Sequence, residues 1–314
     1  MTQSDKTAIL YHSGDDPEPW RRAFQDCARE IEMRVYPDIG KSSDIVAALV
    51  WRPPPGLLAS LPNLKLIHSK GAGIDHLSSD PDLPAGIPVV RLVDRSARLL
   101  MTQYVVHAAL SHHRHMDHYG AAQAEGQWRQ LAPPDTEKTT VAILGLGALG
   151  QDAARMFRAL GFRVIGWSRG PKDIPDVECV HGAEALPSVL RQSQILVCLL
   201  ALTDETRGII NARTLAALPQ GAYVINPARG AHVVDDDLVA ALDSGHIAGA
   251  ALDVFHGEPL APEHRFWSHP KVIVTPHISA DALPRTAAEQ VADNIHRALA
   301  GQPLLNPVDV GRGY

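Results

Sequence analysis

Residues 141–150, VAILGLGALG, decide the fold of this chain. A short apolar run leads directly into a G-x-G-x-x-G pattern, and a segment suited to a helix, about 149–160, follows. In a strand–turn–helix unit the first glycine permits the tight turn, the second lets the backbone approach a pyrophosphate, and the third lets the helix pack on the strand. A structural glycine turn is the alternative. The predicted dinucleotide contacts are Gly145, Gly147, Ala148, Leu149 and Gly150 at the amino end of the helix.

The residues that follow the next predicted strand, 163–166, indicate which nicotinamide cofactor is preferred. An acidic residue about 20 positions past the motif normally accepts the ribose hydroxyls of NAD, but none occurs between positions 161 and 172. Ser168, Arg169 and Lys172 stand there instead, and a hydroxyl with two cations suits a 2′-phosphate. The sequence therefore favours NADP(H), with NAD(H) as the weaker alternative. The competing interpretation is that Arg169 and Lys172 are a solvated pair in a loop.

The composition is that of a folded globular protein. The chain has 314 residues, of which 45% are hydrophobic and 20% charged, enough for two domains with their own cores. A formal charge of −6 argues against a nucleic-acid partner, and the longest apolar runs are too short to span a membrane. The amino terminus lacks the apolar core of a secretory signal, and Cys27, Cys179 and Cys198 show no paired spacing. We therefore expect a cytoplasmic protein with free thiols.

Strand-like and helix-like segments alternate along the chain, which predicts an α/β fold of two Rossmann-like domains with doubly wound parallel sheets. We expect a nucleotide-binding domain, 105–284, inserted into a discontinuous substrate-binding domain, 1–104 and 285–314. The last helix, 281–299, carries apolar residues at four-residue steps. Expected strands are 7–11, 33–36, 45–51, 64–68, 89–92, 163–166, 194–200, 223–226, 249–252 and 272–274.

A predicted helical region, 96–131, is dense in histidine. Histidine is the commonest nitrogen ligand of metals, but these side chains scatter around the helix without a carboxylate or cysteine cluster. We therefore predict no metal site and interpret the region as an exposed helix or a subunit interface, with a C2 homodimer as the expected assembly. Trp128 follows in the same region. The histidines are His107, His112, His113, His115 and His118.

Three polar segments follow predicted strands, at 226–230 (NPARG), 252–259 (LDVFHGEP) and 275–278 (TPHI). Ligands of open parallel sheets bind outside the carboxyl ends of the strands, so these segments are candidates for the site. Considered singly, each reactive residue has an ordinary structural interpretation. Arg229 would be a surface ion-pair partner, Glu258 a solvated loop acid and His277 a loop histidine.

Together and in this order, the segments resemble those of the D-isomer-specific 2-hydroxyacid dehydrogenases, over essentially the whole chain. Residues 71–75 (GAGID) and 202–211 (LTDETRGIIN) belong to the resemblance. The segments VWRPP, GWSR and LPQGAY, at 50–54, 166–169 and 218–223, are similar to the glyoxylate/hydroxypyruvate reductase A group of that family. The resemblance implies NADPH-dependent reduction of small 2-oxo acids, such as glyoxylate and hydroxypyruvate, to glycolate and D-glycerate.

The resemblance also implies roles for individual residues. His277 would give a proton to the substrate carbonyl, Glu258 would hold its other nitrogen, and Arg229 would grip the substrate carboxylate. The N–H groups of Ala72 and Gly73 would complete the carboxylate cradle. The implied cofactor contacts in these segments are Leu200, Leu202, Pro227, Ala228, Arg229 and Asp253.

Substrate choice is less determined by the sequence. Trp51 and Arg52 would close the pocket around a small polar tail, although plain core packing also accounts for Trp51. A phenylpyruvate-type reductase is the enzymatic alternative, and a non-catalytic dinucleotide-sensing protein is the alternative from another class. Formate dehydrogenase is disfavoured, because that branch pairs its histidine with Gln and this chain has Glu258.

Overall fold

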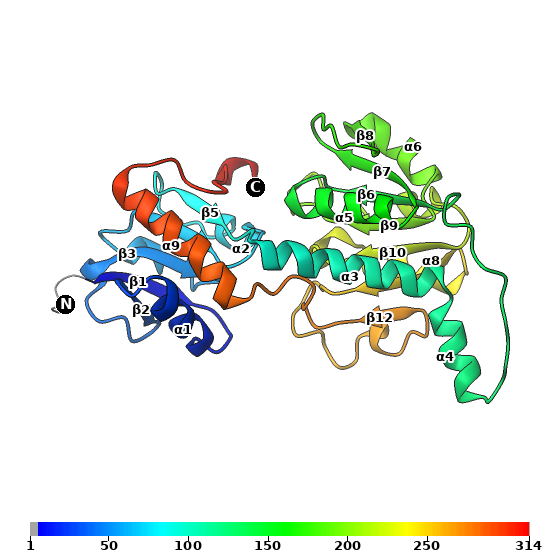
Figure 1. The fold of residues 1–314 in the computed structure, drawn as a ribbon, viewed down its shortest axis with the longest axis horizontal. Coiled ribbons are helices and arrows are strands. Elements are labelled where there is room, and N and C mark those ends of the chain that lie inside the picture. Colours follow the sequence, from blue (N-terminus) through cyan, green and yellow to red (C-terminus); the bar gives the residue numbers. More distant parts are fainter. Residues whose placement is uncertain (1–5, 314) are drawn as a thin grey trace. The chain divides into compact units, whose positions relative to one another are not determined.

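The computed structural model describes residues 6–313, and the chain divides into two compact units (Figure 1). Unit 1 is Met1–Ala97 with Asp281–Tyr314, and unit 2 is Arg98–Ala280. Unit 2 therefore interrupts unit 1 in the sequence. The expected boundaries, 104/105 and 284/285, lie a few residues after those of the structure.

Unit 1 is built on a parallel sheet of five strands in the order β2-β1-β3-β4-β5. Alternate residues of a strand face opposite sides of a sheet, and both sides are buried here. Ile9 and Tyr11 pack with Trp20 of α1 and Val291 of α9, whereas Leu10 belongs to a second cluster on the other side. The elements are β1 (Thr7–His12), α1 (Glu18–Cys27), β2 (Ile31–Val35), β3 (Ile45–Val50), β4 (Leu66–Ser69), α2 (Asp75–Ser78), β5 (Val89–Arg91) and α9 (Pro284–Ala300).

Unit 2 is built on a parallel sheet of seven strands in the order β12-β11-β10-β9-β6-β7-β8. All five residues of its interior strand β6 are buried, as expected of a strand covered on both faces. The strands are β6 (Thr140–Leu144), β7 (Arg163–Ser168), β8 (Glu178–His181), β9 (Ile195–Cys198), β10 (Ala222–Asn226), β11 (Ile247–Leu252) and β12 (Val272–Val274). The helices are α3 (Arg95–His113), α4 (Met116–Ala124), α5 (Ala148–Ala159), α6 (Leu186–Arg191), α7 (Ala212–Ala216) and α8 (Asp235–Asp243).

The strand order of unit 2 reverses beside β6. The chain runs from β6 outward to β7 and β8, and then returns to β9 on the other side of β6. Ligands of doubly wound sheets bind outside the carboxyl ends of the strands at such a reversal. The predicted α/β class with two doubly wound parallel sheets is thus confirmed, and the glycine motif lies at the reversal.

Two local features differ from the sequence prediction. The region 96–131 is not one helix, because His115 has a left-handed backbone with a φ of 56° that separates α3 from α4. Strand β8 was not predicted, since Glu178–His181 forms the outer edge of the sheet and has no fully buried residue. Within residues 6–313, no helix has both the length and the apolar character required to cross a membrane.

Candidate active site

The turn that follows β6 depends on close backbone contacts. Gly145 has a φ of +104°, which L side chains rarely adopt, and its N–H donates to the carbonyl of Trp167 over 2.8 Å. A Cβ at Gly145 would lie 2.5 Å from the carbonyl oxygen of Leu199 and 2.9 Å from the nitrogen of Leu200. Leu200 and Leu202, both half-buried, follow at the end of β9. Glycine is therefore required for the chain to turn at the reversal point.

Helix α5 begins directly after this turn. A Cβ at Gly150 would overlap the carbonyl oxygen of Gly145, so the helix and the turn are in direct backbone contact. Gly147 is exposed, and nothing lies within 4 Å of its Cβ position. It is the N-cap of α5, which no described side chain caps. The N–H groups of the first turn, where Ala148 and Leu149 stand, are thus suited to an anion such as a pyrophosphate.

The end of β7 carries cationic side chains and no carboxylate of its own. Ser168 is buried, and its hydroxyl donates to the carbonyl of Gly170 over 2.8 Å. The guanidinium of Arg169 lies 3.6 Å from a carboxylate oxygen of Glu205, and both side chains are largely exposed. Lys172 is exposed as well. Because an exposed ion pair contributes little to stability, Arg169 can exchange Glu205 for a phosphate at small cost.

Asn226 shapes the turn at the end of β10. Its buried side chain donates from Nδ2 to the carbonyl of Arg229 over 2.9 Å, and its Oδ1 accepts the N–H of Ala228 at 3.2 Å. Pro227 and Ala228 are buried, whereas Arg229 is half-buried. The guanidinium of Arg229 also donates to the carbonyl of Ala228 over 2.6 Å. Asn226 thereby fixes the backbone from which Arg229 projects, a role that the sequence interpretation missed.

Asp253, at the end of β11, holds the loop that carries His277. Its completely buried carboxylate accepts the Thr275 hydroxyl at 2.6 Å and the Ile278 N–H at 3.0 Å. The second oxygen accepts the Ser279 N–H at 2.8 Å, and the Asp253 carbonyl accepts the His277 N–H at 2.8 Å. These bonds hold His277 in a left-handed backbone with a φ of 56°. Asp253 thus supports the loop that carries His277.

Tyr104 extends this network from α3. The Thr275 hydroxyl donates to Asp253, so it accepts a hydrogen bond from the Tyr104 hydroxyl, 2.8 Å away. Burial raises the pKa of Tyr104 to about 12, which keeps the phenol protonated and able to donate at neutral pH. The sequence prediction did not include Tyr104, because 171 residues separate it from Thr275.

His277 and Glu258 form a hydrogen-bonded pair. Nδ1 of His277 lies 3.0 Å from Oε2 of Glu258, and the side chains are 32% and 16% exposed, so the pair is sheltered but accessible. A carboxylate can only accept, so Nδ1 carries the proton and Glu258 sets the tautomer and orientation of the ring. The other oxygen, Oε1, accepts the N–H of Phe255 at 3.1 Å, which anchors Glu258 to its own loop.

The three reactive side chains follow neighbouring strands. β10, β11 and β12 are adjacent and parallel, so the segments that carry Arg229, Glu258 and His277 begin at one edge of the sheet. Two of these segments are in direct contact, because a Cβ at Gly230 would overlap the backbone of Phe255. A guanidinium can bind a carboxylate in two-point fashion, and an imidazole can exchange a proton with a carbonyl oxygen. The set is therefore chemically suited to a 2-oxo acid.

In unit 1, the predicted substrate residues follow β3 and β4. The Ser69 hydroxyl donates to the carbonyl of Gly73 over 2.9 Å, which shapes the loop after β4. No residue between positions 6 and 313 accepts the N–H of Ala72 or of Gly73. These two donors are therefore suited to a carboxylate, as the resemblance implies.

Trp51 packs on this same loop within unit 1. Its ring centroid lies 4.3 Å from that of His76, and a Cβ at Gly71 would lie 2.7 Å from the indole ring. The guanidinium carbon of Arg52 is 6.0 Å from the Trp51 centroid. Trp51 is half-buried and belongs to neither core cluster of the unit. A glycine at position 71 is what leaves room for the indole.

The histidines of the region 96–131 have varied surroundings. His112 stacks on Tyr223 with ring centroids 4.3 Å apart, and His113 lies 3.0 Å from the Thr136 hydroxyl. Burial lowers the pKa of His112 and of His113, so both are neutral at pH 7. Across the described part of the chain, no group of three His, Cys, Asp or Glu side chains is arranged to hold a metal ion.

Comparisons with known proteins decide the family. Residues 106–279 match the model of the "D-isomer specific 2-hydroxyacid dehydrogenase, NAD binding domain" family. The chain belongs to the D-isomer-specific 2-hydroxyacid dehydrogenase family. The matched segment covers most of unit 2, which contains the glycine turn and all three reactive side chains.

Full-length relatives within this family are similar throughout. The glyoxylate/hydroxypyruvate reductase A of Yersinia enterocolitica is 41% identical over 98% of this chain and 99% of the relative. A family member from Xanthobacter autotrophicus Py2, solved with NADPH and MES, is 44% identical, with a TM-score of 0.94 and coverage of 98% and 100%. The NADPH-dependent glyoxylate/hydroxypyruvate reductase of Sinorhizobium meliloti, solved with NADP and sulfate, is 39% identical, with a TM-score of 0.93 and the same coverage.

The two glycines that flank the start of α5 should respond differently to the same added methyl group. Gly150→Ala should lower the free energy of unfolding by about 1–3 kcal/mol, because the new Cβ overlaps backbone that must move. Gly147→Ala should change it by no more than about 1 kcal/mol, the usual scale for an N-cap, but should weaken binding of the dinucleotide. Urea unfolding and fluorescence titration with NADPH measure the two effects, and equal stabilities would contradict this account of the turn.

Proposed function

We propose that this protein is an NADPH-dependent reductase of small 2-oxo acids, which converts glyoxylate to glycolate and hydroxypyruvate to D-glycerate. The observation that carries the proposal is the 3.0 Å pair of His277 and Glu258, which follow β12 and β11; β11 in turn neighbours β10, the strand before Arg229. The names and bound cofactors of the Yersinia, Xanthobacter and Sinorhizobium relatives support the choice of substrates and of NADPH.

The reaction divides among three side chains. The bound cofactor supplies a hydride for the carbonyl carbon. Arg229 binds the substrate carboxylate through its guanidinium fork, a geometry that lysine cannot provide. His277, with Nδ1–H donated to Glu258, uses Nε2 to give a proton to the carbonyl oxygen, and takes it back in the reverse direction. Glu258 keeps the ring oriented throughout.

The cofactor would be held by unit 2. The uncapped amino end of α5, with the open space at Gly147, fits a pyrophosphate. Ser168, Arg169 and Lys172 would face the 2′-phosphate of NADPH, since no carboxylate occupies the end of β7 to favour NADH. Leu200, Leu202, Pro227 and Ala228 would line the cofactor at the adjoining strand ends, and NADH would bind more weakly.

Unit 1 would supply the remaining substrate contacts. The N–H groups of Ala72 and Gly73 would donate to the substrate carboxylate. Trp51 would cover a small polar tail such as a hydroxymethyl group, because its ring is already packed on Gly71 and His76. This favours two- and three-carbon substrates over phenylpyruvate.

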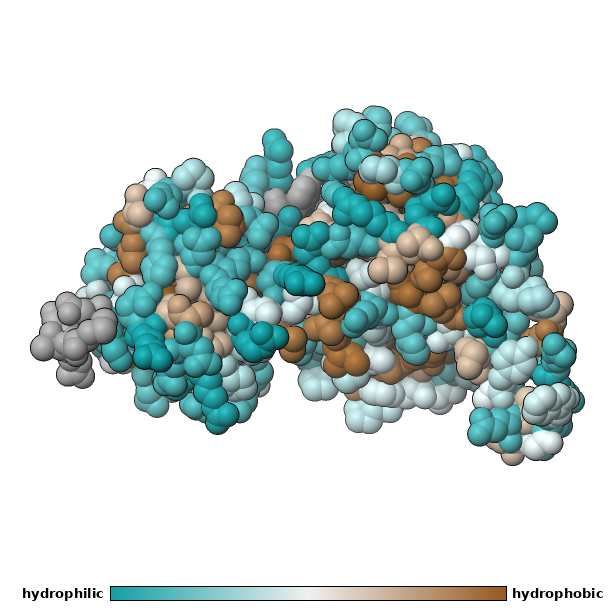
Figure 2. Space-filling view, in the orientation of Figure 1, coloured by the Kyte–Doolittle hydropathy of each residue, from teal (hydrophilic) through white to brown (hydrophobic). Residues whose placement is uncertain are grey.

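A homodimer built on the α3–α4 region accounts for apolar side chains on the surface of unit 2. Leu99 is 50% exposed, Met116 55% and Trp128 100%, and Figure 2 shows hydrophobic residues gathered over the part of unit 2 that α3 crosses in Figure 1. Apolar surface of this kind marks an interface. The free thiols of Cys27, Cys179 and Cys198 suit a reducing compartment, which supports the proposal of a cytoplasmic location.

A substrate panel tests the proposed function. Consumption of NADPH with glyoxylate, hydroxypyruvate and phenylpyruvate should give the highest kcat/KM with one of the two smaller acids. A preference for phenylpyruvate would support the aromatic alternative. No turnover with any 2-oxo acid, together with retained binding of NADPH, would support a dinucleotide-sensing protein instead.

Removal of the proton donor should abolish most turnover. His277→Ala should lower kcat by about 10²–10⁴-fold with the affinity for NADPH retained, because the loss is that of a general acid. His296→Ala is the matched control. His296 also pairs with a glutamate, Glu30, over 2.8 Å, but this pair is exposed and lies in unit 1. Near-normal turnover of His277→Ala would remove this residue from the mechanism.

Arg169 should discriminate between the two cofactors. Arg169→Ala should raise the Kd for NADPH by about 10–100-fold, which corresponds to the loss of a charge-assisted hydrogen bond. The Kd for NADH should remain nearly unchanged. Arg163→Ala, at the opposite end of β7 and paired with Glu178, is the control. Equal losses for NADPH and NADH would show that Arg169 does not read the phosphate.

Light scattering tests the proposed assembly. A dimer has twice the 33.9 kDa mass of the chain, and Met116→Asp should lower the dimer fraction because it places a charge in the apolar contact. A monomeric wild-type protein at micromolar concentration would contradict the proposal.

A further inference from the structure

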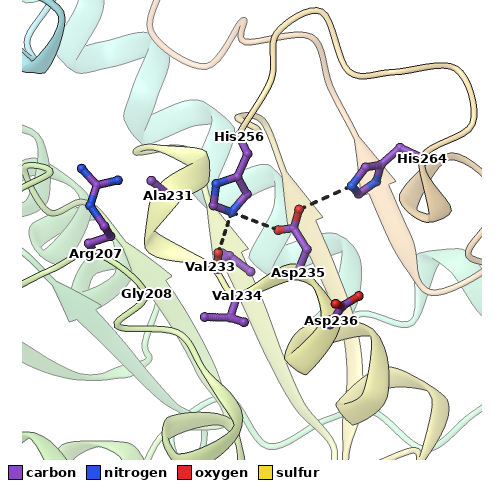
Figure 3. A pocket seen from close by; sticks show the side chains of 9 residues that line it. All are labelled: Arg207, Gly208, Ala231, Val233, Val234, Asp235, Asp236, His256 and His264. Atoms are coloured by element: carbon purple, nitrogen blue, oxygen red, sulfur yellow. Dashed lines mark hydrogen bonds and ion pairs between the residues drawn. The ribbon is translucent and has the colours of Figure 1, made fainter.

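The loop that carries Glu258 is tied at both ends to a single carboxylate. This loop runs from His256 to His264, and Figure 3 shows Asp235 between the two histidines. Nε2 of His256 lies 3.5 Å from one carboxylate oxygen of Asp235, and Nε2 of His264 lies 3.4 Å from the other. The sequence interpretation gave no role to any of these three residues.

Both imidazoles place a protonated nitrogen close to Asp235. Nε2 of His256 lies 2.9 Å from the carbonyl oxygen of Val233, which only accepts, so this nitrogen carries a proton. Nδ1 of His264 accepts the N–H of Phe266 at 3.3 Å, so the proton of a neutral His264 is on Nε2, towards Asp235. The N–H of His264 therefore points to Asp235, whereas that of His256 donates to the Val233 carbonyl and lies 3.5 Å from the Asp235 carboxylate.

Asp235 belongs to the segment that begins with Arg229. The chain passes from Arg229 through the short 3-10 helix at 230–232 to the first residue of α8, which is Asp235. Gly230 packs directly against the backbone of Phe255, so the Arg229 segment and the Glu258 loop already touch at one end. The contacts of Asp235 with His256 and His264 add a second point of attachment.

The surroundings of Asp235 distinguish it from the adjacent Asp236. Burial raises the pKa of Asp235, and the two imidazoles oppose that shift. Its side chain is 27% exposed, whereas that of Asp236 is 95% exposed and makes its ion-pair contact with Arg265 at 3.9 Å. The other charged group that lines this pocket of about 430 Å³ is Arg207, which lies on the opposite side from the histidines (Figure 3).

We propose that Asp235 is a positioning residue for Glu258: it holds both ends of the 256–264 loop, and so keeps the Glu258 carboxylate within hydrogen-bonding distance of His277. The kinetic part of this inference rests on the proposed reductase function. Asp235 acts through the two histidines, whose nitrogens lie 3.5 and 3.4 Å from its carboxylate oxygens.

Asp235→Asn and Asp236→Asn form a matched pair of variants. Each removes one negative charge from the first turn of α8, so the loss of charge at the helix end is the same. In the full-length protein, Asp235→Asn should lower kcat for glyoxylate by about 10-fold or more, with KM changed by less than about 3-fold, because a small displacement of a catalytic group is costly. Asp236→Asn should resemble the wild type.

The pH profile separates positioning from a general loss of stability. If Glu258 is less well held, it retains the proton on His277 less strongly, so the alkaline limb of the kcat profile should move to lower pH in Asp235→Asn only. A loss of kcat with an unmoved profile, or equal kcat values for the two variants, overturns the proposal.

Amide hydrogen exchange gives a readout that requires no turnover. Exchange in the segment 255–266 should be faster in Asp235→Asn than in Asp236→Asn, since the Phe255 N–H is bonded to Glu258 and the Phe266 N–H to His264. Equal exchange in both variants refutes the proposed role of Asp235 in holding the 256–264 loop. A wild-type protein that reduces no 2-oxo acid defeats the proposed function but leaves this comparison valid.

Discussion

The buried carboxylate of Asp253 is the constraint on which the site depends. It accepts three hydrogen bonds from the loop that follows β12, and its own carbonyl accepts a fourth from His277. A carboxylate buried to this extent is costly unless its oxygens are satisfied. The three hydrogen bonds to its oxygens offset that cost, and they join the end of β11 to the loop after β12. His277 is held in a left-handed backbone by that arrangement, and Glu258 completes it by fixing the ring.

The fold was largely predictable because its signals are local. Apolar strands bounded by turn residues predicted both parallel sheets. The spacing of Gly145, Gly147 and Gly150 predicted the turn that connects β6 to α5. Gly145 and Gly150 each have a steric reason in the structure, whereas the Cβ position of Gly147 faces open space. Strand β8 escaped prediction because an exposed edge strand lacks a continuous apolar run.

The candidate site was predictable in its reactive groups but not in its supports. Arg229, Glu258 and His277 stand in recognisable segments, whereas Tyr104, Asn226 and Asp235 act through bonds that depend on the folded backbone. The contact between Tyr104 and Thr275 joins residues 171 positions apart, and no periodicity encodes it. The break between α3 and α4 has the same origin, since it requires His115 to adopt a left-handed conformation that its sequence neighbours do not specify.

The reactive side chains and most of the proposed substrate-recognition residues lie in different units of the chain. Unit 2 holds the glycine turn, the cationic end of β7 and the three reactive side chains, so the groups proposed to bind the cofactor and to transfer the proton belong to one sheet. Its first residue, Arg98, forms two hydrogen bonds of 2.6 and 2.8 Å with Asp152 of α5, which ties α3 to the helix that follows the glycine turn. In the proposed reaction, Trp51, Ala72 and Gly73 of unit 1 contribute to recognition of the substrate. The His277–Glu258 pair that the proposed proton transfer requires therefore depends on contacts within unit 2.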